Sequence, residues 1–235
     1  MYTEKEMLNL NPKLFLGLLS EREILEFFYS CNAYWIDSGD PVMPHAKTTR
    51  GMCTNAYFDC GEVLKYPFVG EILAYQVYLR MREFGFNCNV DMVIGSPYSS
   101  ITFSCELAKH FRARHGFARK DPLDPEGKKM IWKGGIIPSG TNVLQAEELI
   151  TTRWSLDEVR RAVLAVPGSK PNFLSVVACI VHRPRSLSDD CGVDVTALIE
   201  REVWTSKPED CNRCRDGSKR LEPRGNWAEL LTGIK

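Results

Sequence analysis

The segment Asn142–Leu156, "NVLQAEELITTRWSL", joins an apolar run to a hydroxyl-rich turn through two adjacent acids. The apolar residues predict a buried strand over Val143–Glu148. Ser155 and Glu158 have the spacing of a capping box, which predicts a helix over Ser155–Val166. A buried strand followed directly by a helix is the unit from which parallel sheets are built, so this segment indicates an α/β fold.

The alternation of strand and helix continues on both sides of this segment. It predicts a central, mostly parallel sheet with helices on both faces. The expected strands are Val90–Ile94, Val143–Glu148 and Phe173–His182, with candidate strands at Gly116–Arg119 and Met130–Trp132. The expected helices are Ser20–Tyr34, one that begins at Pro67, Ser99–Arg114 and Ser155–Val166, and Asp37–Thr54 is expected to be an ordered loop or hairpin.

The composition is typical of a globular protein, with 44% hydrophobic and 26% charged residues among 235 and a net charge of zero. A zero net charge gives no global field that would favour nucleic acid or an anionic membrane. No apolar run reaches the roughly 18 residues of a transmembrane helix, and the polar start Met1–Lys5 is unlike a signal peptide. We therefore expect a cytoplasmic protein whose nine cysteines, an odd number, are reduced.

Polar groups collect where two expected strands end, in "GSPYSS" at residues 95–100 and "EELITTRWS" at residues 147–155. Ligands bind at this edge of open α/β sheets. Hydroxyls at a helix N-terminus suit a phosphate, and adjacent acids suit hydroxyl groups or a divalent cation, so together they describe a sugar-phosphate site. The alternative is that the hydroxyls only cap a helix and the acids are solvated. The candidate residues are Thr151, Thr152 and Ser155 for the phosphate and Glu147 and Glu148 for the hydroxyls.

The thirteen residues "VLQAEELITTRWS" resemble the phosphoribosyl diphosphate (PRPP) motif of type I phosphoribosyltransferases. Three shorter segments resemble the orotate phosphoribosyltransferase branch: "TRGMCTNAYFDC" at Thr49–Cys60, "VIGSPYSSI" at Val93–Ile101 and "FARKD" at Phe117–Asp121. "CNRCRDGSKRLEPRGNW" is similar to the carboxyl-terminal stretch of some longer bacterial members. The chain is thus identified as a divergent, orotate phosphoribosyltransferase-like member of the type I family.

The resemblance implies transfer of 5-phosphoribosyl from PRPP to a nucleobase, orotate in this branch, with release of diphosphate in pyrimidine nucleotide biosynthesis. It implies Mg²⁺ bound mostly by PRPP itself, and a homodimer in which a mobile catalytic loop reaches the neighbouring site. It implies ribose contacts for Glu147 and Glu148, 5′-phosphate contacts for Thr151, Thr152, Arg153 and Ser155, and diphosphate contacts for Gly95, Ser96, Tyr98, Ser99, Arg119 and Lys120.

The chain also departs from the family pattern. Arg153 and Trp154 replace two glycines of the phosphate loop, and Ser99 replaces a lysine of the diphosphate loop. Leu123 and Pro125 stand where the catalytic loop has a lysine and a histidine, and neither can donate to an anion. Two hypotheses follow. The protein is either an active phosphoribosyltransferase or a catalytically degenerate fold that binds a nucleotide or sugar phosphate, or acts as a regulatory protein.

We expect a single phosphoribosyltransferase-like domain over residues 1–235. Residues 1–60 would form N-terminal helices and a hood segment, residues 61–185 the α/β core, and residues 186–235 a C-terminal cap.

Cys211 and Cys214 form a single C-x-x-C motif, whereas structural zinc needs four ligands. Cys191 or His182 could add to this pair, but free thiols are the favoured interpretation. Three other histidines have no triad-like neighbours and are expected in surface or loop positions: His45, His110 and His115.

Overall fold

The computed structural model describes residues 1–48, 51–186 and 192–231. Within them, five parallel strands form one sheet in the order β11-β10-β9-β5-β6. The three strands predicted with most weight are neighbours in this sheet, which confirms the α/β fold. The strands are β5 (Met92–Gly95), β6 (Arg114–Phe117), β9 (Asn142–Ile150), β10 (Asn172–His182) and β11 (Asp194–Glu200).

Strand β9 lies in the middle of the sheet and determines where the site is built. Val143, Leu144 and Ala146 of this strand are fully buried, as expected for a strand covered on both faces. Gly95, the last residue of β5, is opposite Ala146 in the register. Glu147 therefore lies just beyond the end of the neighbouring strand, at the carboxyl edge of the sheet.

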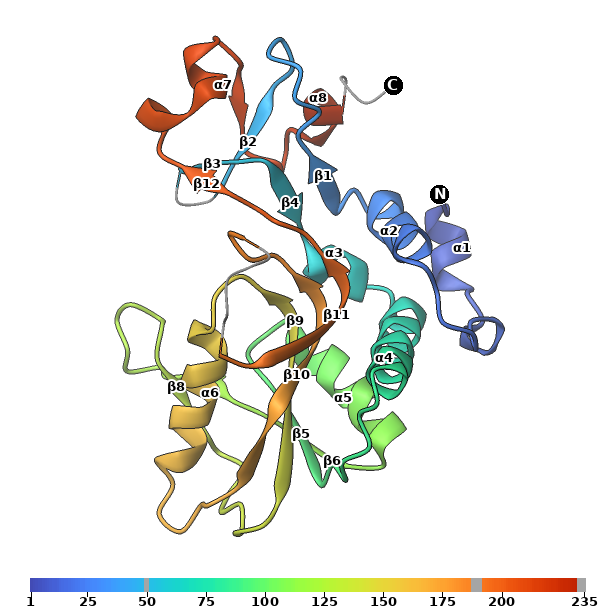
Figure 1. Cartoon of the computed structure of the whole chain (residues 1–235), viewed down its shortest axis with the longest axis vertical. Coiled ribbons are helices and arrows are strands. Elements are labelled where there is room, and N and C mark those ends of the chain that lie inside the picture. Colours follow the sequence, from blue (N-terminus) through green and yellow to red (C-terminus); the bar gives the residue numbers. More distant parts are fainter. Residues whose placement is uncertain (49–50, 187–191, 232–235) are drawn as a thin grey trace.

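Helices cover both faces of the sheet (Figure 1): α4 (Pro67–Glu83) and α5 (Ser100–Phe111) lie on one face and α6 (Trp154–Leu164) on the other. Pro67 occupies the first turn of α4, as predicted, where its missing N–H would have no helical partner. The side chains that pack on the first face include Ile72, Leu73, Val77, Phe103 and Leu107. Those that pack on the second include Val159, Ala162 and Val163.

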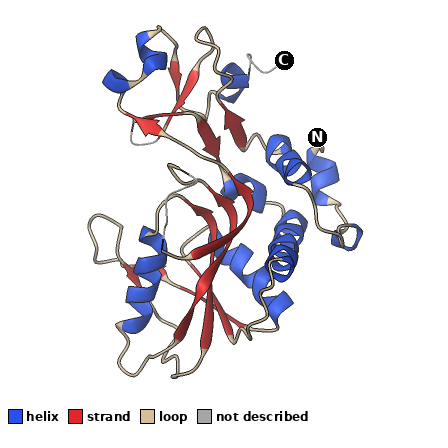
Figure 2. Ribbon diagram, in the orientation of Figure 1, coloured by secondary structure: helices blue, strands red, loops and turns tan. Residues whose placement is uncertain are grey.

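A smaller lobe, which we call the hood, is built from residues 34–58 and 203–231, so segments from both ends of the chain meet in it (Figures 1 and 2). Among the described residues it contains an antiparallel pair and a second small sheet of order β12-β3-β2-β13. The pair is β1 (Tyr34–Ile36) and β4 (Ala56–Phe58). The second sheet consists of β2 (His45–Lys47), β3 (Cys53–Thr54), β12 (Thr205–Ser206) and β13 (Arg220–Leu221). The short helices are η2 (Pro208–Asp210), α7 (Asn212–Arg215) and α8 (Trp227–Leu231).

The hairpin predicted within Asp37–Thr54 is present, because β2 and β3 pair antiparallel. Four further short helices lie beside α4: α1 (Glu4–Leu8), η1 (Pro12–Leu14), α2 (Glu21–Ser30) and α3 (Cys60–Leu64). The capping box of Ser20 and Glu23 at the start of α2 is confirmed. This helix ends before the predicted Tyr34, because Asn32 adopts a left-handed conformation with φ of 52° and the chain then enters β1.

Two other boundaries differ from prediction. The helix predicted to reach Arg114 ends at Phe111, because Arg112 is left-handed with φ of 53° and β6 follows at once. Helix α6 begins at Trp154, and the capping box predicted for its start is absent. Its Glu158 instead forms an ion pair with Arg161 at 2.7 Å. Within residues 1–48, 51–186 and 192–231, no helix is long and apolar enough to cross a membrane.

The prediction that three histidines lie in surface or loop positions was wrong for His45, whereas His110 and His115 are partly exposed, although in a helix and a strand. His110 is in α5, with its ring 5.0 Å from that of Tyr75, and His115 is in β6, 2.9 Å from Ser104 Oγ. His45 is fully buried in β2. Each imidazole has polar or aromatic neighbours from other segments, which the local sequence pattern does not reveal.

Candidate active site

A cleft of about 320 Å³ lies between the carboxyl edge of the sheet and the hood. This is the edge at which open α/β sheets bind ligands. Of the site residues predicted from the sequence, Ser99 and Glu148 line the cleft. The other polar lining residues include Arg183 from the core and Lys47, Tyr57, Asp59 and Arg224 from the hood.

Glu147 is buried beside the turn that follows β5. Its Oε2 accepts a 2.5 Å hydrogen bond from Ser96 Oγ, and Ser100 Oγ lies 3.2 Å from that same hydroxyl. Burial, followed by the charge of Glu148, raises the pKa of Glu147 to about 8, although hydrogen bonds from Ser96 and Ser155 act in the opposite direction. The carboxyl therefore retains its proton at neutral pH. Hydroxyls from two other segments, Ser96 after β5 and Ser155 at the start of α6, thus reach the Glu147 carboxyl.

Glu148 points into the cleft instead, as alternation along a strand requires. Burial raises the pKa of this carboxyl, and its Oε2 has no hydrogen-bond partner among the described residues. Arg183 follows the end of β10 and also lines the cleft, with Nε buried and unpaired among the described residues. Burial also lowers the pKa of this guanidinium. An unpaired acceptor and an unpaired donor in one cleft indicate a site built for a polar ligand.

The hood contributes an ion pair to the same cleft. Arg224 donates from Nη2 and Nε to Asp59 Oδ2, at 2.5 and 2.9 Å, and Tyr57 donates its hydroxyl to the same oxygen at 2.8 Å. Burial alone would raise the pKa of Asp59, but these hydrogen bonds outweigh it and leave the pKa below its ordinary value. Burial and the hydrogen bond to Asp59 raise the pKa of Tyr57 to about 12. The trio joins β4 of the hood to the tail that precedes α8.

The turn between β9 and α6 contains the predicted phosphate-binding residues. Thr151 and Thr152 are exposed at the carboxyl edge, and Ser155 is in the first turn of the helix. Arg153 has a φ of −70°, so the turn is made with ordinary backbone angles and needs no glycine. Its guanidinium donates to Asp157 Oδ1 at 2.8 Å and to the carbonyl of Gly192 at 3.1 Å. In the free protein this guanidinium is therefore already paired.

The turn after β5 matches the predicted diphosphate loop. A side chain at Gly95 would place its Cβ 2.4 Å from Ser104 Oγ and 3.1 Å from the carbonyl of Ser100, so only glycine fits there. The turn leads into the N-terminus of α5, and the side chain of Tyr98 is exposed. The close packing of Gly95 on α5 brings this turn and Ser96 next to β9.

Comparison with known proteins decides the family. The chain is 31% identical over 186 residues to the orotate phosphoribosyltransferase of Pelotomaculum thermopropionicum, which covers 79% of this chain and 91% of that protein. The chain belongs to the orotate phosphoribosyltransferase family. The enzyme of the same name from Caldicellulosiruptor bescii is 29% identical over 179 residues, covering 76% of this chain and 87% of that one. No protein-family model matches the chain.

Solved structures show the same fold. Orotate phosphoribosyltransferase from Aeropyrum pernix superposes with a TM-score of 0.54 at 14% identity, covering 75% of this chain and 93% of that chain. Leishmania donovani UMP synthase also gives a TM-score of 0.54 at 14% identity, covering 79% of this chain and 37% of that larger chain. The type I phosphoribosyltransferase fold predicted from the sequence is therefore confirmed.

The predicted catalytic loop is a hairpin in this family member. Arg119 and Lys120 form β7, which pairs antiparallel with β8 (Met130–Ile131). Lys120 Nζ lies 5.4 Å from the centre of the Trp154 ring, a cation–π contact between the loop and the start of α6. The Arg119 guanidinium lies 5.6 Å from the centre of the Phe117 ring. Leu123 and Pro125, which stand where the family has a lysine and a histidine, are exposed in the connecting loop. The mobility of this loop stays a prediction.

Three residues that line the cleft were not predicted from the sequence: Asp59, Arg183 and Arg224. Arg183 follows the apolar run of β10 directly, so the same strand-end rule that selected Glu147 would have selected it. Asp59 lies within the segment that resembles the family's early substrate loop, but the resemblance assigns no role to this residue. No local signal identifies Arg224, because its partner is 165 residues away in the sequence.

The fold shows where Cys211 and Cys214 lie relative to the additional zinc ligands considered for them. Cys211 and Cys214 lie in the hood, and neither lines the cleft. His182, one of the proposed additional ligands, is paired with Glu200 through Nδ1 at 2.7 Å, and Cys191 lies outside the described residues. None of the described cysteines forms a disulfide.

Proposed function

We propose that this protein transfers 5-phosphoribosyl from PRPP to orotate and releases diphosphate. The observation that carries the proposal is the pair of acids at the end of β9. The pair lies beside two turns that lead into helices, and Glu148 faces a cleft that also holds Arg183, whose Nε has no partner among the described residues. Helix N-termini favour phosphate groups, and buried carboxyl groups favour hydroxyl donors. PRPP presents both kinds of group, and the relatives in the family are named for the same reaction.

The Arg183 guanidinium in the cleft favours an anionic base. Orotate is a planar pyrimidine with a carboxylate, and an arginine guanidinium binds a carboxylate through two parallel hydrogen bonds. Arg183 is suited to this role because its Nε is buried without a partner among the described residues. Arg224 is less available, because Asp59 already accepts from it. We therefore assign Arg183 to the base and the Arg224–Asp59 pair to holding the hood over it.

The chain's own groups would position the reactants and stabilise the departing charge. Glu148 would accept from a ribose hydroxyl through the oxygen that has no partner in the free protein. Glu147 would hold the turn at Ser96 against β9, and Lys120 and Arg119 would approach the diphosphate from the hairpin. Positioning and electrostatic stabilisation are the main catalytic contributions available to a protein in such a displacement.

Mg²⁺ is expected to arrive with PRPP. Three carboxylates line the cleft and fit this arrangement: Asp59 accepts from Arg224 and Tyr57, Glu222 is an exposed residue of the hood, and Glu148 has an oxygen without a partner among the described residues. One carboxylate does not make an all-protein magnesium site, and Mg²⁺ usually keeps waters and binds phosphate oxygens. Bound in this way, the ion would neutralise charge on the diphosphate.

The test is a titration of PRPP with Mg²⁺ by calorimetry, followed by an absorbance assay for orotate consumption. We expect binding and turnover in the wild type, loss of PRPP affinity in Glu148→Gln, and a raised KM for orotate in Arg183→Met with PRPP affinity kept. Arg185→Met, an exposed arginine two residues further on, is the matched control. Absence of both binding and turnover in the wild type would overturn the proposal.

A second candidate function rests on the turn at Arg153. Its guanidinium is held by Asp157 and Gly192, and the family's two glycines are absent. Such a turn suits a protein that binds a sugar phosphate or nucleotide without transferring it. PRPP binding with no turnover on orotate or another nucleobase would favour this function.

A further inference from the structure

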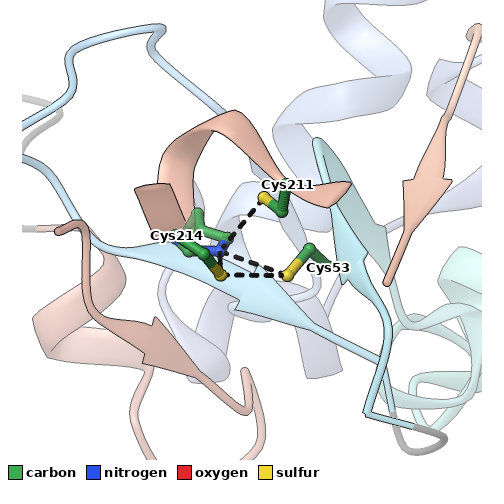
Figure 3. A group of neighbouring side chains, drawn as sticks. Cys53, Cys211 and Cys214 are labelled. Atoms are coloured by element: carbon green, nitrogen blue, oxygen red, sulfur yellow. Dashed lines mark hydrogen bonds between the residues drawn. The ribbon is translucent and has the colours of Figure 1, made fainter. Parts of the chain in front are cut away.

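We infer that the hood holds a structural zinc ion, bound by His45 Nε2 and the sulfurs of Cys53, Cys211 and Cys214. The ligand atoms of these four residues all lie within 4.8 Å of one another. Figure 3 shows the three labelled sulfurs turned toward a common centre. The residues come from β2, β3 and the start of α7, and the inference is independent of the proposed transferase activity.

The distances match a tetrahedron around one zinc ion. Bonds of about 2.3 Å to sulfur and about 2.0–2.1 Å to nitrogen require edges of about 3.8 Å between sulfurs and about 3.6 Å between nitrogen and sulfur. His45 Nε2 lies 3.4 Å from Cys53 Sγ, 3.5 Å from Cys214 Sγ and 3.7 Å from Cys211 Sγ. The sulfurs of Cys53 and Cys214 are 3.5 Å apart. A Cys₃His set at these separations is a closed site of the structural zinc type.

The tautomer of His45 is the one that a metal needs. Ser218 Oγ donates to the carbonyl of Met43 at 2.5 Å, so its oxygen accepts from His45 Nδ1 at 2.8 Å. The proton therefore resides on Nδ1, and the lone pair of Nε2 points at the three sulfurs. A second hydrogen bond that fixes ring and tautomer in this way is the usual support of a metal-ligating histidine.

The hood has only a small apolar core of its own. Its own apolar cluster contains only Trp35, Ala46, Leu221 and Leu230 as buried members among the described residues. The site joins strands near residue 50 to a helix near residue 212, since Cys53 and Cys214 are 161 residues apart in the sequence. Small scaffolds with so little core commonly rely on a metal or disulfides, and no described cysteine here is in a disulfide.

The position of the ion would also support the cleft. Lys47 and Thr48 are two and three residues after His45 and line the cleft, whereas none of the four ligands does. Arg213, between the two cysteines at the start of α7, also donates to Asp37 at 3.0 Å and to the carbonyl of Met43 at 3.2 Å, so the same helix turn is tied to the chain before β2. Zinc here would act by fixing the hood strands, with no part in the chemistry.

The first measurement is metal content. Wild-type protein expressed with added zinc and purified without chelator should contain one zinc per chain. Cys53→Ser and Cys214→Ser should each lose most of it, and Cys88→Ser, an exposed cysteine far from the cluster, should retain it. Circular dichroism of each variant, together with the cobalt spectrum of the wild-type protein, separates loss of a ligand from loss of folding.

The second measurement uses cobalt in the wild-type protein. Zinc exchanged for Co²⁺ should give the intense visible bands of a tetrahedral ion with thiolate ligands, and titration of thiols should show no disulfide in the cluster. Zinc well below one per chain together with absent cobalt bands would overturn the inference. So would zinc that is equally retained in Cys53→Ser and Cys214→Ser, which would mark adventitious binding, or a disulfide between Cys53 and Cys214.

Discussion

Glu147→Gln is the substitution for which the structure specifies a pH-dependent effect on stability. The residue is 3% exposed, and its burial, together with the charge of Glu148, raises its pKa from 4.5 to about 8. In the unfolded chain the carboxyl loses its proton near the ordinary value, whereas the folded protein retains the proton up to about pH 8. Between these two values the folded state binds more protons. The free energy of unfolding therefore falls as the pH rises.

The difference between the folded and unfolded pKa values of Glu147 sets the size of the change in the free energy of unfolding. The span from 4.5 to about 8, at about 1.4 kcal/mol per pH unit, corresponds to about 5 kcal/mol as an upper limit. Water and neighbouring side chains rearrange around a charge that forms in the interior, so we expect a measured difference of about 2–4 kcal/mol. Glutamine preserves the size of the side chain and still accepts from Ser96 Oγ, but it does not titrate.

Urea unfolding of both proteins from about pH 5 to about pH 9 measures this difference. The stability of Glu147→Gln relative to the wild type should rise with pH and level off above about pH 8. All other titrating groups are common to the two proteins, so the subtraction isolates one carboxyl. Glu83→Gln, at an exposed position on α4, is the control and should follow the wild-type profile. Parallel profiles for Glu147→Gln and the wild type would refute the protonated buried carboxyl.

Three further predictions concern the edge of the sheet and the assembly. Gly95→Ala should lower stability by about 1–3 kcal/mol in thermal unfolding, since its Cβ would meet Ser104 Oγ at 2.4 Å. Ser104→Ala should restore part of the loss, and Gly17→Ala, in open space, should be neutral. Arg153→Gly should lower the free energy of unfolding by under about 1 kcal/mol, because the ion pair with Asp157 is largely exposed. The same substitution should weaken PRPP binding measured by calorimetry. An unchanged affinity would exclude contact between Arg153 and the phosphate. Light scattering should show a homodimer, and a strict monomer would count against catalysis across subunits.

The parts of the fold that could be predicted are those set by local periodicity. The run Val143–Glu148 and the strands on either side of it are buried on both faces, so their apolar pattern was sufficient to place them in one parallel sheet. Helix ends were less certain. Asn32 and Arg112 end their helices in the left-handed region, a conformation that non-glycine residues seldom adopt and that no residue pattern here announced.

The hood could not be predicted in the same way. Its strands are two or three residues long, too short for any periodicity, and its ligand cluster joins residues more than 160 positions apart. Counting only neighbouring cysteines gave two zinc ligands and favoured free thiols. Of the other two ligands, Cys53 lies in the segment that resembles the family's early substrate loop, and His45 was expected in a surface or loop position. Only the pairing of β2 with β3 and β13 brings them to Cys211 and Cys214.

The backbone angles of the turn explain how Arg153 and Trp154 can stand where the family has two glycines, and this bears on both candidate functions. A positive φ is one reason for glycine in such a turn, and it does not apply here, because Arg153 has a φ of −70° and Trp154 is already helical. The pairing of Arg153 with Asp157 does not prevent phosphate binding either. The two side chains are 36% and 53% exposed, so their pair contributes about 0–1 kcal/mol, whereas a charge-assisted contact to phosphate contributes about 1.5–3 kcal/mol. Exchange of Asp157 for a phosphate is therefore favourable. Under the proposed function, the substitution would change which groups bind the 5′-phosphate, from backbone amides to a guanidinium, and it is compatible with retained transfer.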